Sequence, residues 1–180
     1  MVDPIKTQRF QAMVMPHINS AYNLARWLTH GHADAEDIVQ ETYLRAFKFF
    51  DSFHGDDSRV WLLSIVRNTF YTWYSQNKVH NQNTPFEEDL QRTDAGAERS
   101  DAENPEHILL QKDSQRILNQ ALRELPIEFR EVMVLRELEE LSYKQIADIV
   151  QMPIGTVMSR LGRGRKQLAA ILSTNNKGEK

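Results

Sequence analysis

Apolar side chains recur every three or four residues in the first third of the chain, which is typical of helices with one buried face. The first helical segment is expected to bend at Pro16, because proline cannot donate the backbone hydrogen bond of a helix, and to end near Gly31. Asp34 is a candidate N-cap for the next helix. The apolar positions of the two segments are Phe10, Met13, Val14, Ile18, Tyr22, Ala25 and Leu28, then Val39, Tyr43, Ala46, Phe47 and Phe50.

A polar loop at residues 51–59 separates these segments from a third predicted helix, at about residues 60–77. Three amphipathic helices can enclose one small hydrophobic core. We expect the third helix to supply Leu62, Leu63, Val66, Phe70 and Trp73 to it.

The C-terminal third has the outline of a helix-turn-helix. Ser142 and Gln145 form a predicted capping box, in which each side chain accepts from the backbone amide of the other residue. A short helix follows, then a turn, then a longer helix over residues 154–172 with a frayed tail behind it. Upstream, one helix is expected to have Pro126 in its first turn. The helix before that, at about 108–125, is expected to face inward with Leu110, Ile117, Leu118, Ala121 and Leu122.

A polar segment at residues 81–105 separates the two groups of helices. It is nearly free of aliphatic side chains and cannot bury enough apolar surface to offset the entropy of ordering. Over residues 81–107, eight acidic side chains against two basic ones give a net charge of −6. The expected fold is therefore all-α, with two small helical domains (residues 8–80 and 106–173) joined by a flexible acidic linker, the C-terminal domain being a helix-turn-helix.

Composition excludes several classes of protein. The 180 residues contain no cysteine, which rules out disulfide scaffolds, thiol catalysis and cysteine-based zinc sites. No apolar run approaches the roughly 20 residues of a membrane span. Residues 1–9 lack the apolar stretch of a secretory signal, so we expect a cytoplasmic protein. The chain has no nucleophile–base pair and no phosphate-binding glycine loop, so we expect no catalytic residue, no metal and no cofactor.

The strongest local signal for function is the basic last helix, which carries four cations and no acid over residues 154–172. Gly162 and Gly164 each cost about 1 kcal/mol inside a helix, which indicates close approach to another backbone or a softened helix. Such a basic face can be merely solvated, or it can read guanine edges and clamp phosphates. The capped helix and turn before it favour DNA binding. An apolar face with Val157, Leu161, Gly164, Leu168 and Ile171 lies opposite Thr156, Arg160, Arg163 and Gln167.

A second signal lies on the third helix. Arg67, Tyr71, Tyr74 and Lys78 follow helical spacing and predict one exposed stripe beside Asn68. Aromatic rings can stack on unpaired bases while cations hold the backbone, and an amide can bond an unpaired base edge. The alternative is that the two tyrosines pack on a neighbouring helix. From the residues alone, packing is favoured.

A third signal is an acidic cluster beside two histidines. A metal-dependent nuclease is one hypothesis for it, but the histidines flank a glycine in a turn and are not spaced as helical ligands. Capping and a solvated face explain the cluster better. The residues concerned are Asp34, Glu36, Asp37 and Glu41, with His30 and His32.

Two long stretches together resemble bacterial sigma factors. Conserved region 2 is similar to HADAEDIVQETYLRAFKFFDSF (residues 32–53) and RVWLLSIVRNTFYTWYSQNK (residues 59–78). Region 4 is similar to LRELPIEFREVMVLRELEELSYKQIADIVQMPIGTVMSRLGRGRKQL (residues 122–168). The extracytoplasmic-function (ECF) group has these two regions, a linker and no other domain. The resemblance implies an alternative sigma factor that binds core RNA polymerase and directs promoter-specific initiation of transcription.

The resemblance also implies partners and site residues. Region 4 would contact the flap of the second-largest polymerase subunit, and an anti-sigma factor, often membrane-bound, would control the protein. Docking on the clamp helices of the largest subunit would use Asp34, Asp37, Gln40, Glu41 and Arg45. Binding and opening of the −10 element would use Phe53, His54, Arg59, Arg67, Asn68, Tyr71 and Lys78. Binding of the −35 element would use Thr156, Ser159, Arg160, Arg163, Arg165 and Lys166.

A stand-alone helix-turn-helix repressor or activator remains an alternative to the sigma hypothesis. It explains residues 108–172 and predicts a dimer on palindromic DNA. It leaves the region 2 pattern and the acidic segment unused.

Overall fold

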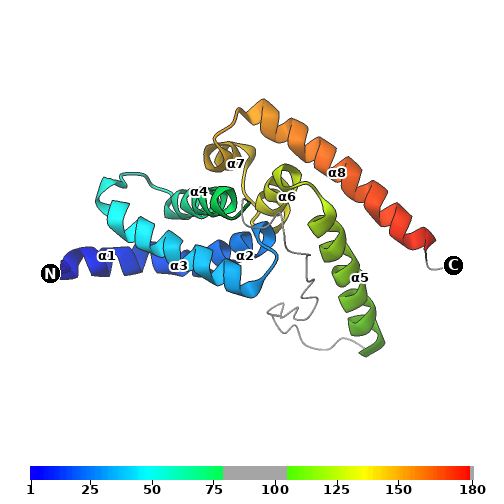
Figure 1. The fold of residues 1–180 in the computed structure, drawn as a ribbon, viewed down its shortest axis with the longest axis horizontal. Coiled ribbons are helices and arrows are strands. Elements are labelled where there is room, and N and C mark those ends of the chain that lie inside the picture. Colours follow the sequence, from blue (N-terminus) through cyan, green and yellow to red (C-terminus); the bar gives the residue numbers. More distant parts are fainter. Residues whose placement is uncertain (79–104, 179–180) are drawn as a thin grey trace.

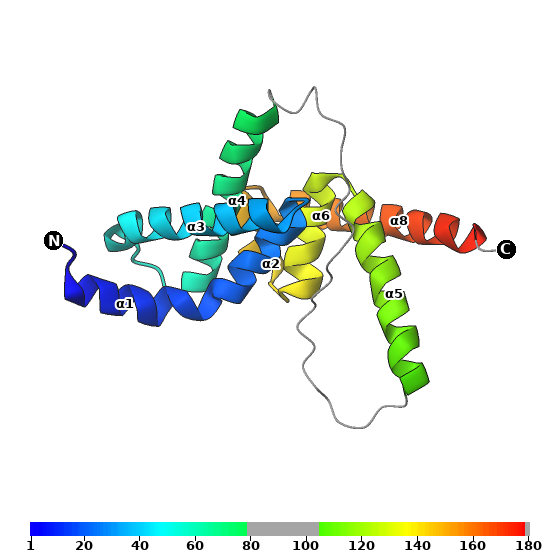
Figure 2. The ribbon, with the colours of Figure 1, turned by 60° about the horizontal axis from the view of Figure 1, so that its bottom comes forward.

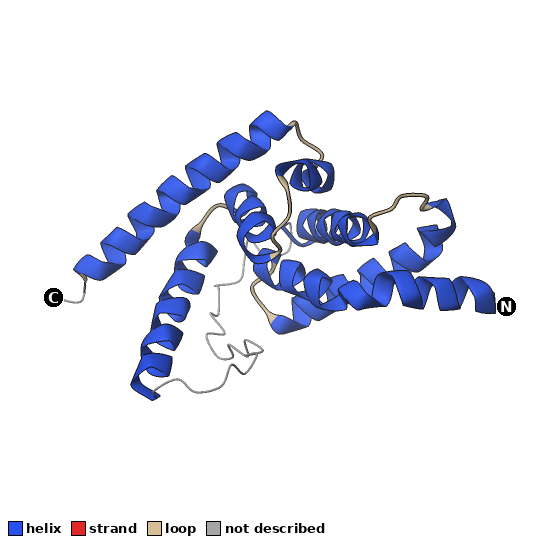
Figure 3. Cartoon of the chain, turned by 180° about the vertical axis from the view of Figure 1, so that it is seen from behind, coloured by secondary structure: helices blue, strands red, loops and turns tan. Residues whose placement is uncertain are grey.

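The computed structural model describes residues 1–78 and 105–178, and every regular element in these ranges is a helix (Figures 1 and 3). The all-α prediction is therefore confirmed for the described part of the chain. The predicted flexible linker lies outside the described residues, except for Pro105, which begins a helix. Within the described ranges, no helix combines the length and the apolar character needed to cross a bilayer.

Over the described residues 1–78, the first domain contains four α-helices around one core. The chain bends at Pro16 as predicted, in a short 3-10 turn at Met15–His17, and a second 3-10 turn at Phe50–Ser52 follows the third helix. Fully buried side chains in this core include Leu24, Ile38, Leu62, Leu63 and Phe70. The helices are α1 (Pro4–Val14), α2 (Ile18–Leu28), α3 (His32–Phe49) and α4 (Ser58–Lys78).

The predicted N-cap of α3 is wrong by three residues. The helix begins at His32, and its N-cap is Gly31, whose backbone is extended. Asp34 instead lies in the first turn, where its negative charge favours the positive end of the helix dipole. The buried face also differs from the prediction, because half-buried Val39, Tyr43 and Phe47 flank a fully buried row formed by Ala35, Ile38, Thr42 and Ala46.

The second domain contains four α-helices and ends in the predicted helix-turn-helix. Pro126 is the N-cap residue of its helix, one position before the first turn in which we expected it. A π-helical turn at Val134–Leu138 follows that helix. The fully buried side chains include Leu125, Leu135, Leu141, Ile146, Ile149 and Leu161. The helices are α5 (Pro105–Glu124), α6 (Ile127–Met133), α7 (Tyr143–Val150) and α8 (Ile154–Lys177).

Two predictions for the second domain are wrong. Leu110 and Leu118 are 67% and 40% exposed, and the N-terminal end of α5 extends away from α6 (Figure 2). Helix α8 does not fray after Leu172 but continues to Lys177. No glycine or proline lies between Leu172 and Gly178, and the Ser173 and Thr174 hydroxyls donate to carbonyls one turn back.

The two domains pack directly on each other, so that segments far apart in sequence lie side by side (Figure 1). Helix α4 of the first domain packs against α7 of the second, and α2 packs against α6. We call this packing of the two domains the closed arrangement.

The two glycines of α8 have different surroundings. A Cβ atom on Gly164 would lie 3.1 Å from Met133 Cγ and 3.4 Å from Phe129 Cβ, so the absence of a side chain lets α8 approach α6 closely. A Cβ atom on Gly162 would meet no atom within 4 Å. Close packing therefore explains Gly164, and nothing in the structure explains Gly162.

This difference predicts opposite effects of one substitution. Gly164→Leu should lower the free energy of unfolding by about 1–3 kcal/mol, because the added side chain overpacks the contact with α6. Gly162→Leu is the matched control and should raise it by about 0.5–1 kcal/mol, because leucine is a better helix former than glycine. Urea unfolding followed by circular dichroism measures both, and equal effects would contradict the packing explanation.

Candidate nucleic-acid interface

The helix-turn-helix is fixed at both ends of α7. The predicted capping box is present: Ser142 Oγ accepts from the Gln145 amide at 3.1 Å, and Gln145 Oε1 accepts from the Ser142 amide at 2.9 Å. At the other end, Gln151 adopts a left-handed conformation (φ 54°) that terminates the helix. Buried Ile146 and Val157 anchor α7 and α8 to the core. The orientation of α8 is therefore set by local hydrogen bonds and by apolar packing.

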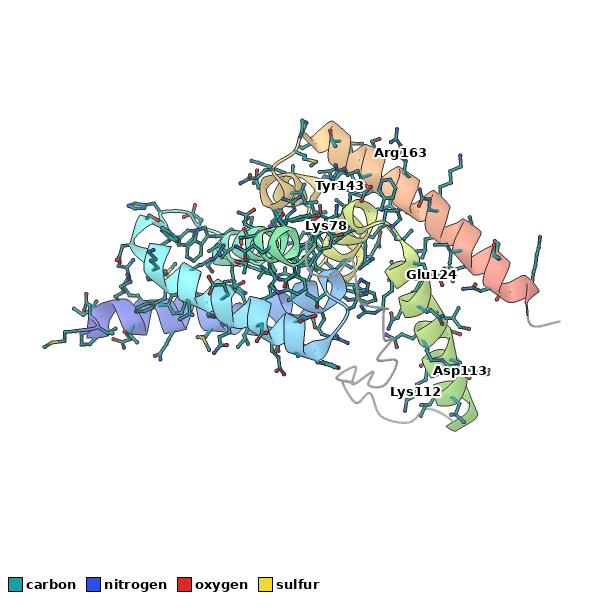
Figure 4. The ribbon with its side chains drawn as sticks, viewed as in Figure 1. Lys78, Lys112, Asp113, Glu124, Tyr143 and Arg163 are labelled. Atoms are coloured by element: carbon teal, nitrogen blue, oxygen red, sulfur yellow. The ribbon has the colours of Figure 1, made fainter. Side chains whose placement is uncertain are left out.

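The outer surface of α8 carries the predicted DNA-contacting residues. Figure 4 shows Arg163 on the outside of α8, away from α6. Arg165 is paired with Glu137 of the same domain at 3.0 Å, and this hydrogen bond raises the pKa of Arg165. Arg160 is only partly exposed, since its Nη1 lies 3.9 Å from Glu131 Oε1. Thr156 is half-buried, and the exposed residues are Ser159, Arg163, Arg165 and Lys166.

The predicted exposed stripe on α4 is wrong for two of its members. Arg67 forms a two-pronged ion pair with Glu131 of α6, with Nε–Oε2 at 2.9 Å and Nη2–Oε1 at 3.1 Å. Its guanidinium also lies 4.6 Å from the centre of the Tyr71 ring, and burial raises the pKa of Tyr71 to about 12. The second domain covers these two side chains, while Asn68 and Lys78 remain exposed.

Predicted DNA-binding residues at the junction between α3 and α4 also form contacts within the protein. Phe53 stacks on Trp61 with ring centres 4.7 Å apart, and His54 is exposed, with Nδ1 2.8 Å from the Ser52 carbonyl oxygen. Arg59 donates from Nη2 to both the carboxylate and the backbone carbonyl of Glu139, at 2.6 and 2.8 Å. Of these three residues predicted to bind DNA, only His54 is therefore exposed, while Phe53 and Arg59, which lies in the first turn of α4, are half-buried.

A separate polar surface lies on α3. Along this helix, Arg45 Nε donates to Glu41 Oε1 at 2.8 Å. Asp37 and Gln40 are exposed, and Asp34 is half-buried. Beside them lies a groove of about 760 Å³ between α3 and the first two helices, lined by Phe10, Ile18, Tyr22, Val39, Tyr43, Leu44 and Phe47, among others. Acidic and apolar groups next to each other are suited to bind a protein surface rather than DNA.

Two arginines of the second domain contact the C-terminal end of α2 in the first domain. Arg123 Nη1 donates to the Thr29 carbonyl at 3.2 Å, and Arg130 Nη1 donates to the Trp27 carbonyl at 3.0 Å. These guanidiniums satisfy carbonyl groups at the C-terminal end of α2, where the helix dipole favours cations. Burial and the neighbouring arginines lower the pKa of Arg123 to about 10.

Two acids at this boundary between the domains, Glu131 and Glu139, were not among the predicted site residues. Glu131 and Glu139 are 1% and 6% exposed, and both accept from arginines of the first domain. A signal for Glu131 is present in the sequence, because it lies one helical turn from apolar Ile127 and Leu135. An acidic side chain in an apolar row indicates a buried cationic partner. Among the described residues, no group of three or more histidine, aspartate or glutamate side chains converges on a possible metal position.

Comparisons with known proteins match both domains. A family model described as Sigma-70 region 2 matches residues 13–79, and one described as Sigma-70, region 4 matches residues 115–168. The ECF RNA polymerase sigma-E factor of Haemophilus influenzae is 34% identical over 137 residues, which cover 75% of this chain and 72% of that protein. The RNA polymerase sigma-H factor of Pseudomonas aeruginosa is 30% identical over 169 residues, covering 91% and 86%.

Two solved structures share the fold. The sigma factor RpoE from Bartonella quintana, in complex with the anti-sigma factor NepR, has a TM-score of 0.74 and 27% identity, covering 92% of this chain and 98% of that one. CnrH, in complex with the cytosolic domain of CnrY, has a TM-score of 0.62 and 22% identity, covering 93% and 90%.

Proposed function

Because the chain belongs to the ECF group of the sigma-70 family and is an alternative sigma factor, we propose that it binds core RNA polymerase and carries it to promoters through two separate DNA contacts. The observation that carries the proposal is the presence of regions 2 and 4, in that order, with a basic recognition helix on the second. The protein has no catalytic activity of its own in this proposal. It works in the cytoplasm, where core polymerase is found.

The polymerase-binding surface is the α3 face with Asp37, Gln40 and the Glu41–Arg45 pair. This surface is exposed in the closed arrangement. Beside it lies the groove between α3 and the first two helices, in whose lining the Leu44 side chain is 64% exposed. An apolar centre with a charged rim is the usual composition of a specific protein interface. The acids of α3 would pair with basic residues of the clamp helices on the largest subunit, and region 4 would contact the second-largest subunit.

Promoter contacts divide between the two domains. Helix α8 would enter the major groove of the −35 element, where arginines read guanine edges or hold phosphates. Asn68 and His54 are free to contact unpaired bases of the −10 element. Arg59, Arg67 and Tyr71 would contribute there only after the second domain moves away, because that domain now covers them.

Control by an anti-sigma factor is supported by the RpoE relative, which was solved in complex with NepR. An inhibitor that binds both domains would hold the protein away from polymerase. A stand-alone repressor is less well supported, because such a regulator has no use for a region 2 domain.

Reconstituted transcription tests the proposal directly. Purified protein added to core polymerase and DNA fragments from its own genome should give transcripts with defined start sites, and neither component alone should do so. A chain that fails to bind core polymerase, or that binds a palindromic operator tightly without it, would refute the sigma function.

Arg163→Ala should weaken binding of the polymerase–protein complex to the −35 element by about 1–3 kcal/mol if the guanidinium contacts a base. Arg116→Ala, which removes a similarly exposed arginine from α5, is the matched control and should leave affinity unchanged. Competition binding with promoter fragments measures both. Equal affinities for the two variants would remove Arg163 from the site.

Asn68→Ala should impair strand opening more than polymerase binding, because an amide that bonds an unpaired base is needed only after the duplex separates. Permanganate reactivity of unpaired thymines reports opening, and co-purification with core polymerase reports binding. Asn23→Ala, an exposed asparagine on α2, is the control. An equal loss of opening and polymerase binding would contradict a role in base capture.

A further inference from the structure

An exposed apolar side chain lies among the predicted DNA contacts of the recognition helix α8. Met158 is 53% exposed and lies in the second turn of the helix, directly before Ser159. In a helix-turn-helix, residues near the N-terminal end of the second helix contact base edges in the major groove. Met158 is not among the residues predicted to bind the −35 element, because those residues are all polar or cationic.

The helix surface around Met158 is open. Gly155 lies three residues before Met158 and Gly162 four residues after it, so the three positions form one row along α8. A Cβ atom on either glycine would meet no atom within 4 Å. Helical side chains lean toward the N-terminus, so Met158 lies over the turn that contains Gly155. Met158 is therefore the one side chain of this row, and no neighbour in the row separates it from a ligand.

A second exposed apolar side chain on α8 has different surroundings. Ile154 is 45% exposed and lies one turn before Met158. It lines a hollow together with Ala147 of α7 and Met152 of the turn, and Met158 is not part of that lining. Ile154 thus borders α7, and it provides a matched apolar control for Met158.

The chemistry of a thioether limits what Met158 can read. Its side chain has no hydrogen-bond donor, and its sulfur is only a weak acceptor. In the major groove, the C5 methyl group of thymine is the apolar feature by which base pairs differ. A methionine over guanine or cytosine would instead exclude water from polar base edges without replacing the hydrogen bonds. Contact with Met158 therefore favours a T·A pair over a G·C pair.

We propose that Met158 is a specificity-determining residue, which selects a thymine in the −35 element by contact with the C5 methyl group of that base. The inference rests on the proposed sigma function, because polymerase brings α8 to this element. It adds a contact of a different kind to those of the arginines. Arg163 can bind a guanine edge or a phosphate, whereas Met158 distinguishes bases by one methyl group.

Removal of single methyl groups from the DNA tests the contact. The probe is a genomic promoter fragment that the polymerase–protein complex transcribes, with each thymine of the −35 element, on either strand, replaced in turn by deoxyuridine. Replacement at one position should lower the affinity of the wild-type complex about fourfold, the effect of one buried methyl-sized group. Competition binding measures the change. A −35 element without thymine, or one in which no replacement lowers affinity, would overturn the proposal.

Variants assign the methyl contact to Met158. Met158→Ala should bind the unmodified fragment about fourfold more weakly than wild type and lose no further affinity on the deoxyuridine fragment, because both changes remove the same contact. Met158→Leu should restore the difference between the two fragments, since leucine also presents a long apolar side chain. The control Ile154→Ala should keep that difference. A difference that persists in Met158→Ala, or that disappears in Ile154→Ala, would contradict the assignment.

Folding and polymerase binding are checked in the same variants. Ile154 and Met158 are both exposed, so circular dichroism should show unchanged helix content in all three variants. Co-purification should show unchanged binding to core polymerase, because the methyl contact is made to DNA alone.

Failure of this inference and failure of the sigma function give different results. Wild-type protein that directs transcription with core polymerase, while deoxyuridine has no effect on binding, rejects only the role of Met158. Wild-type protein that neither binds core polymerase nor directs transcription rejects the proposed function, and the role of Met158 with it.

Discussion

The packing of the two domains depends on ion pairs between partly buried arginines and carboxylates that are almost completely buried. A carboxylate as buried as that of Glu131 must be paired, because an isolated charge in a protein interior costs several kcal/mol. Its main partner, Arg67, lies 64 residues away and is itself only 14% exposed. These pairs contribute little net stability compared with an apolar contact of similar size, but they require α4 and α6 to meet in one register.

Local sequence signals predicted local structure well. The capping box at Ser142, the bend at Pro16 and the apolar face of α8 each depend on residues within one or two helical turns, and the structure has all three. Only the resemblance to the sigma family predicted that the two small helical domains act together, because local sequence signals carry no information about that. The errors at element ends are of a familiar kind: Gly31 rather than Asp34 caps α3, because an extended glycine can fill the N-cap position as well as an acid.

The misplaced side chains have a different cause. Periodicity places Arg67 and Tyr71 on the polar side of α4, but it carries no information about a second domain that arrives to cover that side. The same limit explains Leu110 and Leu118, since the apolar row on α5 predicts burial along its length, whereas only its C-terminal end, with Ala121 and Leu122, is buried. Sequence patterns show which face of a helix differs from the others, and only the tertiary contacts show what lies against it.

The placement of Trp27 gives the protein an internal optical reporter. The chain has three tryptophans; Trp61 and Trp73 pack against aromatic rings of their own domain, while Trp27 lies under the Arg123 guanidinium at the boundary. Indole emission depends on hydration and on nearby charge, so separation of the domains would change the fluorescence of this one ring and leave the other two as an internal reference. The opening of the molecule is thus visible without any attached dye.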